Sequence, residues 1–169
     1  MTDAAYQAKE WLERLGELYE QAEKIEREIS IMEDHINNAV SNYEYTGRGH
    51  TDMMVRQQHR EDALLDYSAK KAQYEREYLK FVKEEIITLK VLDRMKNREH
   101  AALLMNRYIN RLTWEEISKL KRHNQQAAQT QKKHRLALEE LSTLLNTEEP
   151  RAIREAETLI QSYYKKDSA

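Results

Sequence analysis

Apolar residues recur along the first part of the chain in alternating steps of four and three, which is the spacing of a heptad seam. Charged residues fill many of the positions between them, so the opposite face of such a helix would be solvated. We therefore expect one long helix from about Asp3 to about Glu44. Its inward positions are Trp11, Leu15, Leu18, Ala22, Ile25, Ile29, Met32, Ile36, Ala39 and Tyr43.

Gly47 and Gly49 interrupt this pattern and indicate a loop over residues 45–50. Thr51 and Asp52 can cap a second helix, because a side-chain oxygen there accepts hydrogen bonds from free backbone N–H groups. A short loop between two long helices places them antiparallel, so that their apolar stripes can bury each other. The second stripe consists of Leu65, Ala72, Leu79, Val82, Ile86, Leu89 and Leu92, widened by Tyr67, Tyr74, Tyr78 and Phe81.

Beyond Asn97 the apolar pattern shortens and predicts short helices. The first spans Arg98–Asn110. Thr113 and Glu116 have the spacing of a capping box, in which each side chain satisfies a backbone N–H group of the other residue. This box predicts a second short helix that ends near Arg122.

A longer helix is expected from residue 124 or 125 to residue 145, after a turn at His123 and Asn124. Asn146 or Thr147 can cap a last helix, where Pro150 would be tolerated in the first turn. The fold class is therefore all-α. Its expected parts are a long antiparallel, coiled-coil-like hairpin over residues 1–97, a helix-turn-helix domain over residues 98–145 and a docking helix over residues 146–169.

Composition supports long helices and excludes several kinds of chemistry. The chain has three glycines and one proline, whereas 34% of its residues are charged, and sheets need more turn residues than this. The absence of cysteine excludes disulfides, thiolate metal sites and thiol nucleophiles. No apolar run has the length of a signal peptide core or a membrane span, so we expect a cytoplasmic protein without membrane contact. Because a two-helix hairpin has little interior, we also expect a homo-oligomer.

The net charge of −2 conceals a concentration of positive charge in the middle of the chain. Residues 1–97 hold 15 Lys and Arg against 20 Asp and Glu, residues 98–145 hold 9 against 5, and residues 146–169 hold 4 against 5. Three consecutive helices, with cations around the second turn and the start of the third helix, are typical of a helix-turn-helix, which places its last helix in the major groove of double-stranded DNA.

The predicted DNA-binding residues fall into two groups by chemistry. Amide side chains can pair with adenine edges, whereas lysine and arginine can reach phosphates or guanine. The amide group comprises Asn124, Gln125, Gln126 and Gln129, and the cationic group comprises Lys119, Lys121, Arg122, Lys132, Lys133 and Arg135. Thr130, Gln131 and His134 are expected to lie exposed among them.

The stretch LLMNRYINRLTWEEI, residues 103–117, resembles phage proteins of the ArpU and RinA kind. These are late-gene transcriptional regulators whose C-terminal half is similar to the promoter-reading helix-turn-helix of sigma factors. The stretch ALEEL, residues 137–141, is similar to the end of that unit, and the hairpin with its glycine loop is similar to the layout of these proteins. The resemblance implies a phage or prophage regulator with a sigma-like helix-turn-helix on promoter DNA, and RNA polymerase or another phage protein as a further partner.

The chain departs from this family at the turn before the last helix of the unit. The family has a Gly-apolar-Ser turn followed by apolar residues, whereas residues 121–128 read KRHNQQAA. Aligning residues 112–117 and 137–141 together requires an insertion between them. Depending on where it falls, the inward positions are Ala128 and Gln131, or Thr130 and Lys133.

Enzymatic, metal and cofactor chemistry are not expected. The six histidines contain no pair at the helical spacing that would place two metal ligands on one face. Gly47-Arg48-Gly49 lacks the Lys-Ser/Thr partner and the preceding strand of a phosphate-binding loop. The alternative to a DNA-binding regulator is a helical interaction or assembly protein, such as a virion or DNA-packaging component, whose helix-turn-helix is a protein-docking surface.

Overall fold

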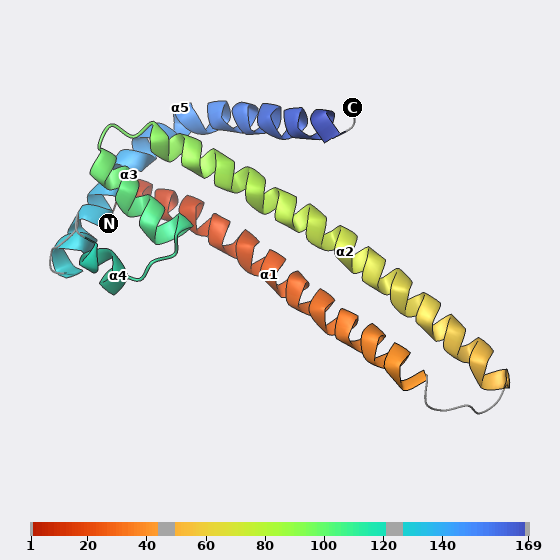
Figure 1. The fold of residues 1–169 in the computed structure, drawn as a ribbon. Coiled ribbons are helices and arrows are strands. Elements are labelled where there is room, and N and C mark those ends of the chain that lie inside the picture. Colours follow the sequence, from red (N-terminus) through yellow and green to blue (C-terminus); the bar gives the residue numbers. More distant parts are fainter. Residues whose placement is uncertain (1, 44–49, 121–126, 168–169) are drawn as a thin grey trace. The chain divides into compact units, whose positions relative to one another are not determined.

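A computed structural model describes residues 2–43, 50–120 and 127–167, and every regular element in them is helical, as expected for an all-α chain (Figure 1). The predicted loop around Gly47 and Gly49 lies outside the described residues. None of the helices in the described residues is long and apolar enough to span a bilayer. The elements are α1 (Asp3–Tyr43), α2 (His50–Asp93), α3 (Arg98–Leu104), the π-helix η1 (Met105–Ile109), α4 (Trp114–Lys119) and α5 (Ala127–Asp167).

The chain divides into two compact units. The first, called the base, comprises Met1–Glu17 and Lys80–Ala169. The second, called the arm, comprises Leu18–Leu79. The start of α1 and the end of α2 therefore belong to the same unit as the short helices and α5, whereas the arm holds the rest of the hairpin.

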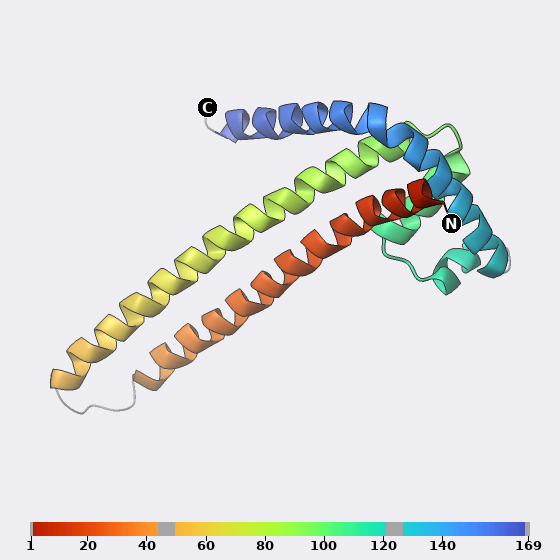
Figure 2. The same cartoon turned by 180° about the vertical axis from the view of Figure 1, so that it is seen from behind.

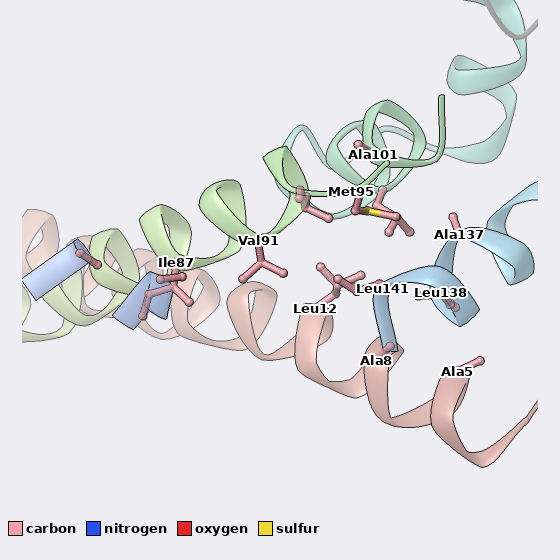
Figure 3. Packing of buried hydrophobic residues seen from close by; sticks show 14 residues of the cluster. Ala5, Ala8, Leu12, Ile87, Val91, Met95, Ala101, Ala137, Leu138 and Leu141 are labelled. Carbon is pink, nitrogen blue, oxygen red and sulfur yellow. The ribbon is translucent and has the colours of Figure 1, made fainter. Parts of the chain in front are cut away.

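The base has a continuous apolar core built from α1, α2, α3 and α5. Leu12 of α1, Val91 of α2 and Leu141 of α5 gather in this core (Figure 3). Alanines on α1 and α5 let the helix backbones approach closely, because they add only a methyl group at the contact. The buried members are Ala5, Ala8, Leu12, Ile87, Val91, Leu92, Met95, Ala101, Leu104, Ala137, Leu138, Leu141, Ala152 and Ala156.

Helix α5 is one continuous helix, which corrects the prediction of a separate last helix capped at Asn146 or Thr147. Pro150 stands inside α5 and leaves the Asn146 carbonyl without its usual intrahelical N–H partner. Asn146 is exposed, so water can satisfy that carbonyl at small cost. Helix α5 bends in this region (Figure 2), as expected for an interior proline.

Contacts from α1 and α2 hold the bent segment of α5 in place. Trp11 Nε1 donates a hydrogen bond to Glu149 Oε1 at 2.6 Å. Arg94 of α2 donates to the Glu148 carbonyl oxygen at 3.3 Å and to Glu155 Oε1 at 2.7 Å. The same guanidinium thus contacts α5 on both sides of Pro150. The hydrogen bond from Lys90, with a smaller contribution from the charge of Arg94, lowers the pKa of the Glu155 carboxyl group.

In the arm, the aliphatic residues of the predicted α2 stripe do not face α1, whereas Tyr67 and Tyr74 of that stripe are partly buried. Leu65 is 69% exposed and Leu79 is 36% exposed, and Ala72 between them is exposed as well. Polar pairs also join the two helices: the Tyr67 hydroxyl donates to Glu33 Oε1 at 2.5 Å, and Lys70 forms an ion pair with Glu28. The predicted α1 seam does turn inward, and the buried hydrophobic residues described in the arm are Ala22 and Ile25.

Candidate nucleic-acid interface

The predicted capping box at the start of α4 is present. Thr113 Oγ1 accepts a hydrogen bond from the Glu116 backbone N–H at 3.2 Å, and Glu116 Oε2 accepts from the Thr113 backbone N–H at 2.7 Å. The hydrogen bonds that the Thr113 backbone N–H and hydroxyl donate to the Glu116 carboxylate lower the pKa of that group. The capping box therefore fixes the start of α4 at Thr113 and Trp114.

A π-helix ends the predicted Arg98–Asn110 helix and turns the chain toward α4. The Asn110 N–H donates to the Met105 carbonyl at 2.9 Å, which closes a wider turn than an α-helix has. Arg111 follows in the left-handed region with φ 57°, a conformation that often terminates helices. The Arg107 guanidinium donates to the Leu112 carbonyl at 2.9 Å and holds this reversal together.

A cluster of aromatic rings joins η1, α4 and α5. The His134 ring of α5 packs edge-on against Trp114 with 4.9 Å between ring centroids, and it stacks on Tyr108 at 5.8 Å. The guanidinium carbon of Arg107 lies over the Trp114 ring, 4.8 Å from the ring centroid. Burial, with smaller contributions from the cations of Arg107 and Lys9, lowers the pKa of His134 to about 4. The cluster fixes the orientation of α4 against the first half of α5.

His134 and Thr130 were expected to be exposed, and the structure corrects both positions. His134 is half-buried in the aromatic cluster, and Thr130 is 1% exposed. Of the two alternatives for the inward face of α5, the pair Thr130 and Lys133 agrees with the structure, because Gln131 is exposed. Thr130 Oγ1 has no hydrogen-bond partner in the described part of the chain, so the polar threonine occupies a position where an apolar residue would pack at lower cost.

The outward face of α5 carries three of the predicted DNA-binding side chains. Gln129, Lys132 and Arg135 are exposed, and their spacing places them on adjacent turns of one helix. Lys119 is exposed at the end of α4. The remaining predicted residues of the turn, Lys121, Arg122, Asn124, Gln125 and Gln126, lie outside the described residues.

Two of the predicted phosphate contacts are engaged in ion pairs. Lys133 Nζ lies 3.3 Å from Glu99 Oε2 of α3, and Arg135 Nε lies 3.2 Å from Glu139 Oε1, one turn further along α5. Exposed pairs of this kind are weak, so a phosphate can replace the carboxylate as partner. Lys132 is exposed and makes no ion pair within residues 2–43, 50–120 and 127–167.

Sequence reasoning missed two apolar side chains near this surface. Leu136 is 46% exposed on α5, one turn after Lys132, and Leu120 is 38% exposed at the end of α4. The sequence gives little signal for either, because a leucine among charged residues is normally assigned to a core. Apolar side chains on a recognition helix can contact the methyl group of thymine, and they also suit a protein contact.

Comparison of this chain with protein-family models, curated protein sequences and solved structures found no match. The resemblance of residues 103–117 to the phage regulators therefore stays a prediction.

Proposed function

We propose that the chain is a phage or prophage transcription regulator that binds double-stranded promoter DNA through a helix-turn-helix formed by α4 and the first half of α5. One observation carries this proposal: α4 is capped and packed through Trp114 onto His134, while Gln129 and Lys132 stay exposed on the other face of α5. A helix fixed on one face and bearing amide and ammonium groups on the opposite face suits the major groove.

The side chains of this face would contact different parts of the DNA. Gln129 would contact a base edge through its amide, whereas Lys132 and Arg135 would contact phosphates. Lys133 would exchange Glu99 for a phosphate at the edge of the interface. In this arrangement phosphate contacts supply most of the affinity and the amides supply sequence preference.

A titration of duplex DNA from the chain's own genomic neighbourhood tests the proposal, with fluorescence anisotropy measured at several salt concentrations. We expect affinity to fall steeply with salt, because each neutralised phosphate releases a counterion. Replacing Lys132, Lys133 and Arg135 together with alanine should weaken binding to all duplexes, whereas Gln129→Ala should mainly reduce the preference for the specific duplex.

The matched control removes three exposed cations from the arm: Arg27, Arg60 and Lys71 to alanine. Both triple variants lose the same net charge, so a general electrostatic effect would weaken them equally. Equal losses, or no binding by the natural sequence even at low salt, would contradict the proposal.

A second candidate function is a helical interaction or assembly protein that uses this surface to dock another protein. The observation that favours it is the pairing of Lys133 with Glu99 and of Arg135 with Glu139, together with the exposed Leu136. These pairs reduce the positive charge available to DNA. Weakened affinity for a protein partner after the α5 triple substitution, combined with absence of DNA binding, would support this candidate.

A further inference from the structure

The two units bury apolar side chains to very different extents. The core of the base contains large fully buried residues such as Leu12, Leu92 and Leu138. The buried hydrophobic residues described in the arm are Ala22 and Ile25, although the arm contains two long helices. A helical pair with so little burial gains too little from the hydrophobic effect to offset the entropy of ordering it, and proteins commonly resolve this by association.

The apolar residues that the arm leaves exposed are regularly spaced on α2. Leu65, Ala72 and Leu79, here called the α2 stripe, follow one another at intervals of seven residues and are all exposed. Seven residues make nearly two helical turns, so the three side chains lie on one face of the helix. That face points away from the contact with α1, which α2 makes through Tyr67 and Lys70.

The balance of charge differs between the two ends of this face. Glu61 and Asp62 lie at the Leu65 end of the α2 stripe, whereas Arg76 lies at the Leu79 end beside Glu75. All four are exposed. Two copies of the face in parallel would place the acidic ends together, whereas two antiparallel copies would place the acidic end of each beside Arg76 of the other.

We propose that the α2 stripe binds the same stripe of a second copy of this chain, antiparallel, about a two-fold axis that passes near Ala72. Leu65 and Leu79 lie seven residues on either side of Ala72, so this symmetry packs Leu65 of each copy against Leu79 of the other. The small Ala72 lets the two backbones approach at the axis. The contact covers the exposed apolar face of each α2, on the side opposite α1, and joins the two hairpins into one four-helix assembly. It involves the arm and does not depend on DNA binding by the base.

The mass of the full-length chain in solution, measured by sedimentation equilibrium over a range of concentrations, tests the association. We expect a dimer whose dissociation constant rises by at least about tenfold in the double variant Leu65→Asp with Leu79→Asp, because two apolar contacts are replaced by buried charges. Ile31→Asp is the matched control, since Ile31 is 57% exposed in the arm but lies on α1, outside the α2 stripe. It should leave the dissociation constant unchanged. Circular dichroism of all variants checks that their helix content is retained.

Single cysteines test the direction of pairing, because the natural chain contains none. Ala72→Cys at the axis should form a disulfide between copies under mild oxidation. Leu65→Cys should not, because its two copies would be separated by the length of fourteen helical residues, about 20 Å, far beyond disulfide reach. A mixture of Leu65→Cys and Leu79→Cys chains should cross-link again.

Three results would overturn this proposal: a monomer at all concentrations, a dimer that the double variant leaves intact, or efficient cross-linking of Leu65→Cys alone, which indicates parallel helices. Each can occur whether or not the protein binds DNA. If the α5 triple variant loses DNA binding but still dimerises, the pairing of the arms remains supported.

Discussion

The hydroxyl oxygen of Tyr108 lies 3.0 Å from Nε2 of His134, where η1 meets α5. Burial raises the pKa of Tyr108 to about 12 and lowers the pKa of His134 to about 4, so at neutral pH both side chains are uncharged. A neutral imidazole with its proton on Nδ1 accepts at Nε2, and the Tyr108 hydroxyl then donates to it. The orientation of the proposed recognition helix therefore depends on an uncharged histidine.

This pair predicts a loss of stability in mild acid. The unfolded chain protonates His134 near pH 6.5, whereas the folded chain resists protonation until about pH 4. The neutral form therefore contributes stability fully above pH 6.5, and this contribution is lost as the pH falls from 6.5 toward 4. It amounts to at most about 3 kcal/mol. Urea unfolding at several pH values should show this slope in the natural chain.

The variant His134→Gln separates this effect from the protonation of carboxylates, which destabilises the protein at lower pH. Glutamine does not titrate and can still bond to Tyr108, so the slope between pH 6.5 and 4 should become flatter. An unchanged slope would show that His134 is not the group responsible.

Neighbouring leucines on α5 should differ strongly in their contribution to stability. Leu138 is 0% exposed in the core of the base, whereas Leu136 is 46% exposed on the outward face. Leu138→Ala should lower the free energy of unfolding by about 2–5 kcal/mol, because it leaves a cavity. Leu136→Ala should change it by less than about 0.5 kcal/mol. Urea denaturation of the two variants measures both values, and similar losses would contradict the orientation of α5.

Local sequence signals predicted two features of the fold correctly. The α1 seam and the Thr113–Glu116 capping box depend on residues within a few positions of one another, where spacing alone determines the contact. The structure agrees with both. Burial of His134 could not be predicted in this way, because it follows from Tyr108 and Trp114, which lie on other helices.

The differences on α2 and α5 arise from contacts between distant segments. The spacing of apolar residues alone predicted that Leu65 and Leu79 of α2 face α1. The polar pairs of Tyr67 and Lys70 with α1 instead leave these two leucines on the outer face of α2. Similarly, Pro150 indicated a helix start, because interior prolines cost about 3 kcal/mol. Here contacts with Arg94 hold α5 on both sides of the proline. The ten predicted DNA-binding residues stay a prediction, and half of them lie outside the described residues.

Arg94 should be more important for stability than its charge alone suggests. Its guanidinium donates to the Glu148 carbonyl and to Glu155, and it is mostly buried, whereas Lys83 makes one exposed ion pair with Glu157. Arg94→Met should lower the free energy of unfolding by about 1.5–3 kcal/mol, because it removes hydrogen bonds donated by a charged group. Lys83→Met should cost less than about 0.5 kcal/mol. Thermal and urea unfolding compare the two, and equal effects would contradict the role of Arg94 at the bend.

The adjacent residues Lys132 and Lys133 should contribute unequally to DNA binding if the proposed function is correct. Lys132 is exposed without an ion pair in the described residues, whereas Lys133 must first leave Glu99. Lys132→Ala should reduce the slope of log affinity against log salt by about one, the value for one lost phosphate contact, and Lys133→Ala should reduce it by less.

Glu99→Gln provides the complementary test, because it frees Lys133 and removes a negative charge beside the proposed DNA surface. It should strengthen binding, and the added Lys133→Ala substitution should then weaken binding by more than it does in the natural chain. Glu115→Gln, an exposed carboxylate on α4, controls for the change in net charge. If Glu99→Gln and Glu115→Gln raise affinity equally, and the two lysine variants behave alike, the ion pair between Lys133 and Glu99 has no influence on DNA binding.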